Sequence, residues 1–288
     1  MNYFDLHCDT PYECYFKNQP FSVNKLAVSG EKGAEFESWR QVFAVWIRDD
    51  IPEPFKLYSE IMRDIKLKLK SAPKNLKPLF AVEGGAVIGK DLRLLEALKS
   101  DSVCYLTLTW NGENELGSGH TTTHGMTDFG RQAVREMEDR GILVDVSHLN
   151  DTGYADLFET ARRPFVATHS NARAICSHKR NLTDDMIREM VRRNCLIGLN
   201  YYTGFITNDE NYDDPENFYR HIEHFFELGA YENLALGSDF DGAHLPTYLN
   251  SPAKSAALYE YFLEKGMSKE LAEGIMFRNA EEFFRKNL

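Results

Sequence analysis

Six ionisable side chains follow short apolar segments that are spread over the whole chain. These residues are His7, Asp9, Glu83, His148, His169 and Asp239. Imidazole and carboxylate ligands without thiolates suit zinc, with Mn²⁺ and Co²⁺ as competitors. A carboxylate between two metal ions usually holds them about 3.5–4 Å apart, and such a pair activates water for hydrolysis. The residue types therefore predict a metal site.

Each of these residues, taken singly, also has a purely structural explanation. A histidine at a strand end is more often a hydrogen-bonded core residue than a ligand, and Glu83 before two glycines suits a turn. The two acids Asp239 and Asp241 suit an ordinary loop, and spacing alone does not choose between them. The joint pattern favours metal, because burying three histidines and three carboxylates together is costly unless they pair or bind an ion.

The first apolar segment carries ionisable residues at every second position. His7 and Asp9 are two residues apart, so their side chains point to the same side of a strand. Cys8 lies between them, points the other way and is expected only to pack. Asp5 belongs either to a layer behind the metal ligands or to the base of the fold, and the sequence leaves both open.

Eight short segments rich in β-branched and aromatic residues are predicted to be strands. They cover residues 3–9, 41–48, 76–85, 103–110, 142–148, 164–170, 195–204 and 234–242. The six ionisable residues end the first, third, fifth, sixth and eighth of these segments. If the strands are parallel and share one sheet, all six side chains meet at one face.

Amphipathic stretches between the strands predict helices at residues 52–70, 127–141, 183–194 and 251–265. Strict alternation of strands and helices implies parallel strands. Eight such units in a chain of 288 residues predict one α/β domain over residues 1–288, a (β/α)8 TIM barrel with its site at the carboxyl ends of the strands. An open doubly wound sheet is the alternative, but no glycine-rich phosphate loop follows the first strand.

Composition excludes several classes of partner. The formal net charge is −11, which argues against nucleic acid and anionic membranes as partners, since both attract cationic surfaces.

The five cysteines lack a paired CxxC motif and are expected to be reduced thiols. No apolar run is long enough to span a bilayer, and we expect a cytoplasmic protein.

Three further groups of residues are weaker candidates. His221 and His224 have metal-compatible spacing, but a solvated helix face outside the barrel is the favoured interpretation. The "SHKRN" stretch is either a basic surface loop or a clamp in which Arg180 binds a carboxylate in a forked geometry. No GxSxG serine motif is present.

The chain resembles the membrane dipeptidase (renal dipeptidase) family of zinc peptidases nearly end to end. The resemblance rests on "FDLHCDT", "AVEGG", "YLTLTW", "GILVDVSH", "THSNARAICSHKRNLTDD" and "GSDFDG". It implies two zinc ions per chain. By this resemblance His7 and Asp9 bind one ion, His148 and His169 bind the other, and Glu83 bridges them.

The resemblance also implies the remaining roles. Arg180 is similar to the arginine that grips the C-terminal carboxylate of a dipeptide. Asp239 is similar to the acid that handles the proton and the substrate's amino group. The activity implied is hydrolysis of short peptides by metal-activated water, with Asp239 as general acid–base and Glu83 holding the metals. A homodimer is expected on the same ground.

One position departs from the family pattern. The family commonly carries a histidine after "LTLT", where it helps to hold the carbonyl oxygen of the substrate, and this chain has Trp110. We expect Trp110 to form a wall of the substrate pocket. His120 and His124 lie on the loop that follows, and one of them is expected to replace the missing group, although either alone suits an exposed loop.

Two other functions compete with a dipeptidase. One is a different binuclear amidohydrolase, such as a lactonase or deaminase, but those commonly bridge their metals with a lysine where this chain offers Glu83. The other is a barrel that binds small ligands without turnover. The presence of all five metal ligands argues against it.

Overall fold

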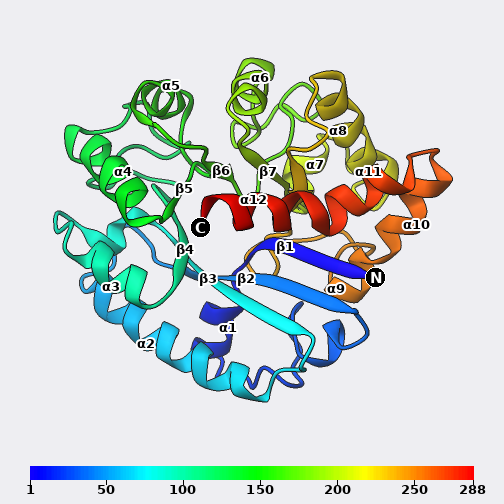
Figure 1. The fold of residues 1–288 in the computed structure, drawn as a ribbon, viewed down its shortest axis with the longest axis horizontal. Coiled ribbons are helices and arrows are strands. Elements are labelled where there is room, and N and C mark those ends of the chain that lie inside the picture. The colour runs from blue at the N-terminus through cyan, green and yellow to red at the C-terminus, as the bar shows by residue number, and fades with distance from the viewer.

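Eight parallel strands pair in chain order and close into a barrel in the computed structural model, which describes residues 1–288 (Figure 1). The strands are β1 (Asn2–Cys8), β2 (Ser38–Trp46), β3 (Leu76–Glu83), β4 (Val103–Thr107), β5 (Leu143–Asp145), β6 (Val166–Ala167), β7 (Leu196–Leu199) and β8 (Leu234–Leu236). Each lies within or overlaps its predicted segment. Pairing of β1 with β8 closes the ring, so the (β/α)8 prediction is confirmed and the open sheet is wrong.

Helices follow the strands of the barrel, and most of them lie around its outside (Figure 1). They are α1 (Thr10–Phe16), α2 (Pro54–Lys68), α3 (Leu94–Ser100), α4 (Asp128–Arg140), α5 (Asp151–Thr160), α6 (Asp184–Arg192), α7 (Thr203–Ile206), α8 (Pro215–Glu227), α9 (Pro252–Ser255), α10 (Ala257–Glu264), α11 (Lys269–Glu273) and α12 (Asn279–Asn287). Short helical turns lie at η1 (Glu31–Gly33), η2 (Leu69–Ser71), η3 (Gly85–Ile88) and η4 (Gly274–Arg278). None of the helices has the length and apolar character needed to cross a membrane.

The predicted helix starts are confirmed by their caps. The side chains of Thr127, Thr183 and Ser251 each accept a hydrogen bond from a backbone N–H three residues ahead. Helix α4 ends at Gly141, whose left-handed backbone (φ 66°) stops the helix and turns the chain into β5. The prediction at residues 251–265 proved to be two short helices, α9 and α10.

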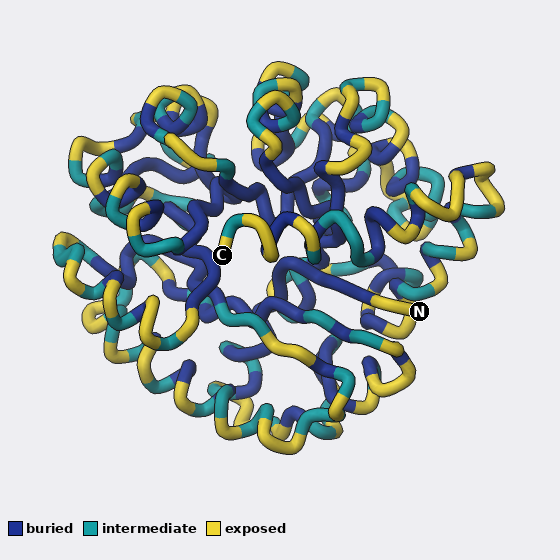
Figure 2. The backbone as a smooth tube through the Cα atoms, viewed as in Figure 1, coloured by how far each residue is buried: buried dark blue, intermediate teal, exposed yellow.

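Two clusters of apolar side chains hold the strands and the helices together. The larger lies between the strands and the surrounding helices, and the smaller fills the barrel interior. In Figure 2 the strands are mostly buried, and the outer helices alternate between buried and exposed turns. All five cysteines are buried and none forms a disulfide. Cys8 belongs to the outer cluster and donates its thiol to the carbonyl oxygen of Val42 (3.4 Å), as expected for a packing residue.

The amino end of the barrel is plugged by α12, which lies across the middle of the ring of strands (Figure 1). Its residues Ala280, Phe283 and Phe284 join the inner cluster. The ring of Phe284 lies 5.3 Å from that of Phe4 on β1. The carboxyl end of the barrel has no such plug, and buried polar residues gather there instead.

Candidate active site

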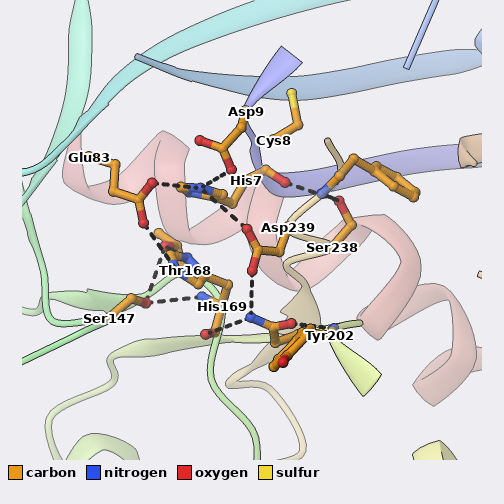
Figure 3. Close-up of polar contacts among 12 residues, drawn as sticks. His7, Cys8, Asp9, Glu83, Ser147, Thr168, His169, Tyr202, Ser238 and Asp239 are labelled. Atoms are coloured by element: carbon orange, nitrogen blue, oxygen red, sulfur yellow. Dashed lines mark hydrogen bonds and ion pairs between the residues drawn. The ribbon is translucent and has the colours of Figure 1, made fainter. Parts of the chain in front are cut away.

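The six predicted side chains converge at the carboxyl end of the barrel. Three groups of three potential ligands have all their donor atoms within 4.8 Å of one another: His7–Asp9–Glu83, Glu83–His148–His169 and His7–His169–Asp239. Figure 3 shows Glu83, His7 and Asp9 turned toward each other, with Asp239 on the other side of His7. Residues up to 232 positions apart in the chain thus meet because parallel strands end at one face.

Glu83 lies at the centre of this arrangement. Its Oε2 atom is 3.6 Å from Nε2 of His7, and its Oε1 atom is 2.7 Å from Nε2 of His148 and 3.5 Å from Nε2 of His169. Each carboxylate oxygen therefore faces a different set of donors. This arrangement is compatible with a carboxylate that bridges two metal ions.

The spacing of the donors fits a divalent cation. Tetrahedral zinc with bonds of about 2.0–2.2 Å places neighbouring ligand atoms roughly 3.3–3.6 Å apart. Nε2 of His7 lies 3.5 Å from Oδ2 of Asp9 and 3.6 Å from Oε2 of Glu83. Nε2 of His7 and Oδ1 of Asp9 are buried and have no hydrogen-bond partner in the protein. A cation at this point would satisfy groups that are otherwise costly to bury.

Neutral oxygen acceptors orient the three histidines. Tyr105 donates its hydroxyl to the carbonyl oxygen of Leu6 (2.9 Å), so its oxygen accepts from Nδ1 of His7 (2.9 Å). Asn111 Oδ1 accepts in the same way from Nδ1 of His148 (2.8 Å). In both rings Nε2 is left with its lone pair directed at the cluster, as metal ligation requires.

His169 is held by a longer relay. Thr168 donates its hydroxyl to Oδ2 of Asp145 (2.8 Å) and accepts from Nδ1 of His169 (2.9 Å). The Asp145 carboxylate is itself fixed by the hydroxyl of Thr107 (2.6 Å). Tyr105, Thr168 and Asp145 were not singled out in the sequence. Their strand-end positions in "YLTLTW", "ILVDVSH" and "PFVATHS" were the available signal.

Charges in the cluster offset one another. Burial would raise the pKa of Glu83, but its contacts with the neighbouring imidazole rings of His7 and His148 outweigh burial and hold that pKa well below its ordinary value. Burial and repulsion by Glu83 raise the pKa of Asp9 well above its ordinary value. Burial and the charge of Arg180 lower the pKa of His148 to about 3, which keeps its ring neutral and able to bind metal.

Left-handed backbone turns two of these side chains into the mouth. His148 has φ 74° and Asp239 has φ 63°, conformations that non-glycine residues rarely adopt. Both residues lie just beyond a strand end, where the chain bends away and the side chain stays over the barrel. Such strain is typical of residues held in place for function.

The structure shows that Asp239 and the nearby Asp241 have different environments. Asp239 has Oδ1 4.0 Å from Nε2 of His7, and its Oδ2 accepts from the side-chain amide of Asn200 (3.2 Å). Asp241 instead accepts from the hydroxyl of Thr10 and the backbone N–H of Ala27, both at 2.6 Å, and ties two loops together. Asp239 alone faces the cluster.

Asp5 belongs to the layer behind the cluster. Its carboxylate accepts from the hydroxyl (2.6 Å) and backbone N–H (2.8 Å) of Ser238 and from the side-chain amide of Gln41 (2.8 Å). It thereby joins β1 to β2 and to the segment after β8. Burial raises the pKa of Asp5, and these hydrogen bonds oppose that rise.

A cavity of about 510 Å³ opens over the cluster. Arg180 forms part of its wall, is only 5% exposed and stacks over Phe205 (5.4 Å to the ring centre). Its Nε and Nη2 atoms have no partner in the protein. Lys179, the next residue, is exposed. Arg180 is therefore not part of a basic surface loop, and its guanidinium can receive an anion in the cavity.

Trp110 lies in the cavity wall as expected. Its ring packs edge-on against Trp46 (5.0 Å), which packs in turn against Tyr12 (4.8 Å). All three aromatic residues border the cavity. They form an aromatic wall on the β1, β2 and β4 side of the mouth, while Arg180 enters from the β6 side.

The histidines of α8 were interpreted wrongly. His221 is fully buried, accepts from the backbone N–H of Ala172 (3.1 Å) and donates to the carbonyl oxygen of Ile206 (2.8 Å). Its burial lowers its pKa to about 4. His224 is 15% exposed and contacts Asp184 (2.8 Å). Neither lies on a solvated face, and both connect α8 to neighbouring elements.

The chain is similar to several known proteins in sequence or in fold. An uncharacterized protein in the pqqA 5′ region of Klebsiella pneumoniae is 30% identical over 217 residues, which is 72% of this chain and 80% of that protein. A metallo peptidase from Rhodobacter sphaeroides, liganded with a phosphinate mimic of the dipeptide L-Ala-D-Ala, shares the fold with a TM-score of 0.91 at 21% identity, over 100% of this chain and 99% of that one. The dipeptidase AC structure gives a TM-score of 0.90 at 23% identity, over 100% and 98% of the two chains.

A family model described as membrane dipeptidase (peptidase family M19) matches residues 43–286. This range holds Glu83, His148, His169, Arg180 and Asp239, and of the six ionisable residues predicted from the sequence it leaves out His7 and Asp9. The chain therefore belongs to the membrane dipeptidase family, peptidase family M19.

Proposed function

We propose that this protein is a binuclear zinc dipeptidase that hydrolyses short peptides with a free C-terminal carboxylate. The observation that carries the proposal is Glu83, whose two carboxylate oxygens face two separate donor sets. His7 and Asp9 would hold one ion, and His148 and His169 the other. Mn²⁺ or Co²⁺ could occupy the same donors.

Two bound zinc ions would supply an activated water near neutral pH and would polarise the scissile carbonyl. Asp239 would carry out the proton transfers. Its carboxylate lies beside the cluster and is held by Asn200 (3.2 Å). It would accept a proton from the attacking water and pass it to the leaving amine, as a general base and then a general acid.

Arg180 would determine the length of the substrate. A buried guanidinium with two unpaired nitrogens is suited to a carboxylate, which it binds through parallel hydrogen bonds. Arg180 borders the same 510 Å³ cavity as Asp9, Glu83 and His148, so a carboxylate bound to Arg180 would lie in one cavity with the metal donors. A substrate with a single residue after the scissile bond would suit this arrangement, which would favour dipeptides over longer chains.

Trp110 would contact the other end of the substrate. With the carboxylate on the β6 side of the mouth, the N-terminal residue extends toward the aromatic wall of Trp110, Trp46 and Tyr12. Apolar and aromatic side chains gain most from such a surface. The phosphinate dipeptide mimic bound by the Rhodobacter sphaeroides enzyme supports a ligand of this size.

The alternatives are less well supported. A lactonase-type or deaminase-type centre that uses a bridging lysine would need one at the mouth, and no lysine borders the cavity. A barrel that only binds ligands would not need the partly exposed acid Asp239 beside the metal donors.

The test is a panel of dipeptides, dipeptide amides, tripeptides and lactones, assayed with zinc-loaded protein and elemental analysis. We expect about two divalent ions per chain, hydrolysis of free-acid dipeptides, and loss of that activity with a chelator. Metal-free protein with full activity, or turnover of lactones alone, would contradict the proposal.

A further inference from the structure

The loop after β4 folds back over the mouth of the barrel and is firmly anchored there. Gly119 donates its backbone N–H to Gly112 (2.7 Å), and Thr121 donates its own to Asn111 (3.2 Å). From the other side, Asn150 donates its backbone N–H to Ser118 (3.1 Å) and its side-chain amide to Thr122 (3.0 Å). Residues 118–122 are therefore held between the ends of β4 and β5.

Gly119 brings this loop unusually close to the end of β4. A Cβ atom at this position would clash with the carbonyl oxygen of Trp110 and with the backbone of Asn111. Only glycine permits that approach. The contact fixes the next residue, His120, at the edge of the cavity that Trp110 also borders.

The His120 ring borders the cavity between two other histidine rings. Its centre lies 6.3 Å from the ring of the metal-ligand candidate His148 and 5.8 Å from the ring of His178, on the loop that carries Arg180. Its Nδ1 atom is buried and has no hydrogen-bond partner in the protein. His120 thus has a buried ring nitrogen without a hydrogen-bond partner. Its ring lies between the metal-ligand candidate His148 and the loop that carries Arg180.

His124 on the same loop has a different environment. Its side chain is 81% exposed and its Nδ1 atom pairs with Glu113 (2.6 Å). It does not border the cavity. The structure therefore distinguishes two histidines that the sequence left equivalent.

We propose that His120 is a catalytic residue that donates an imidazole N–H to the scissile carbonyl oxygen as negative charge develops on it. This inference rests on the proposed dipeptidase function. In a dipeptide the scissile carbonyl carbon is only three covalent bonds from the C-terminal carboxylate carbon. A ring that borders the cavity between His148 and the loop that carries Arg180 is therefore placed within reach of that carbonyl.

The chemistry of the ring suits this role. Burial and the charge of Arg180 lower the pKa of His120 to about 4, so the ring is neutral with one N–H at neutral pH. The proton stays on the nitrogen throughout, and His120 makes or breaks no covalent bond. A preorganised donor of this kind stabilises the transition state more than the bound substrate.

The experiment compares His120→Ala, His120→Gln and the matched control His124→Ala with the parent enzyme. We expect His120→Ala to lower kcat about 10²–10³-fold, the size of a lost oxyanion donor. His120→Gln, which keeps an N–H donor, should recover part of this loss, and His124→Ala should match the parent. A phosphinate mimic of the preferred dipeptide, measured by calorimetry, should bind His120→Ala more weakly by a comparable factor, while metal content and Tm stay unchanged.

Dipeptide amides separate this role from carboxylate binding. His120→Ala should lose as much activity on amides as on free acids, because the carbonyl is common to both. A loss confined to free acids would overturn the assignment, as would parental kcat and phosphinate affinity in His120→Ala. A parent that hydrolyses no dipeptide overturns the proposed function together with this inference, whereas an active parent with an equally active His120→Ala overturns the inference alone.

Discussion

The two ends of the barrel are closed by opposite kinds of chemistry. At the amino end, α12 inserts Ala280, Phe283 and Phe284 beneath the strands, and these side chains pack against others of the same kind. At the carboxyl end, the buried atoms include Nε2 of His7 and Nε of Arg180, which have no partner in the protein. One end stabilises the fold by removing apolar surface from water, and the other retains polar groups at a cost.

This contrast indicates which end of such a barrel carries the functional site. Natural proteins satisfy their buried polar groups almost everywhere, so a cluster of exceptions indicates a ligand. The left-handed backbone at His148 and Asp239 also lies at the carboxyl end. Substitutions at the mouth should therefore change metal and substrate binding, and substitutions at the plug should change stability.

The largest effect is expected from Glu83→Ala, which removes a ligand from both proposed metal positions. We expect metal content to fall at both positions and kcat/KM to drop about a thousandfold or more, since metal ions supply several kcal/mol of transition-state stabilisation. Elemental analysis and dipeptide kinetics measure this. The control is Glu96→Ala, at a 72% exposed position of α3. Retention of both ions in Glu83→Ala would refute the bridging role.

Phe284→Ala tests the opposite end. Phe284 is 5% exposed and packs on Phe4, so its truncation should reduce the free energy of unfolding by about 3–5 kcal/mol. Urea denaturation measures the loss. KM and metal content of the folded enzyme should not change. Phe16→Ala, at a site that is 55% exposed, is the matched control. A changed KM with unchanged stability would contradict the proposal that the amino end serves stability and the carboxyl end serves binding.

Arg180→Ala should weaken substrate use without weakening the fold. A charge-assisted carboxylate contact contributes about 1.5–3 kcal/mol, which corresponds to a loss of roughly 10–150-fold in kcat/KM on free-acid dipeptides. Dipeptide amides should lose little. Tm should stay constant or rise, because a buried unpaired charge is removed. The exposed neighbour supplies the control, Lys179→Ala. Equal losses on acids and amides would mean that Arg180 is structural.

Of these four substitutions, Thr168→Val is expected to have the smallest effect, which is a loss of metal affinity. It keeps the side-chain shape but removes the oxygen that accepts from Nδ1 of His169 and donates to Asp145. Losing such a partner typically lowers metal affinity about 10–100-fold. Competition with a chelating dye measures it. Thr109→Val is a matched control, since Thr109 is equally buried but its hydroxyl has no partner. Equal affinities in the two variants would argue against the relay.

Much of this arrangement was predictable from local sequence. Each strand is a short apolar segment bounded by turn residues, and strict alternation with helices leaves few topologies besides the closed barrel. Because parallel strands end at one face, the convergence of His7, Glu83 and His148 followed from their places at strand ends. The cap residues Thr127 and Thr183 gave the helix starts.

Other features depend on tertiary contacts. Asp239 and Asp241 both have left-handed backbone, and only the packed loops show that Asp241 turns away to Thr10. That α12 enters the barrel likewise depends on what its apolar face meets. The error at His221 was avoidable. Phe218, Ile222 and Phe225 occupy the same helical stripe, and a residue within it is expected to be buried.

The closure of the ring through Asp5 has a consequence for biosynthesis. Asp5 on β1 accepts its hydrogen bonds from Ser238, which lies 233 residues later in the chain. At translation rates of about 5–20 residues per second, roughly ten to fifty seconds separate the appearance of these two residues. During that interval β1 has no β8 to pair with and its buried carboxylate has no serine partner. Contacts this distant in sequence form slowly. Because Asp239 directly follows Ser238, the nascent chain can bring Asp239 to His7 only after the first and last strands have met.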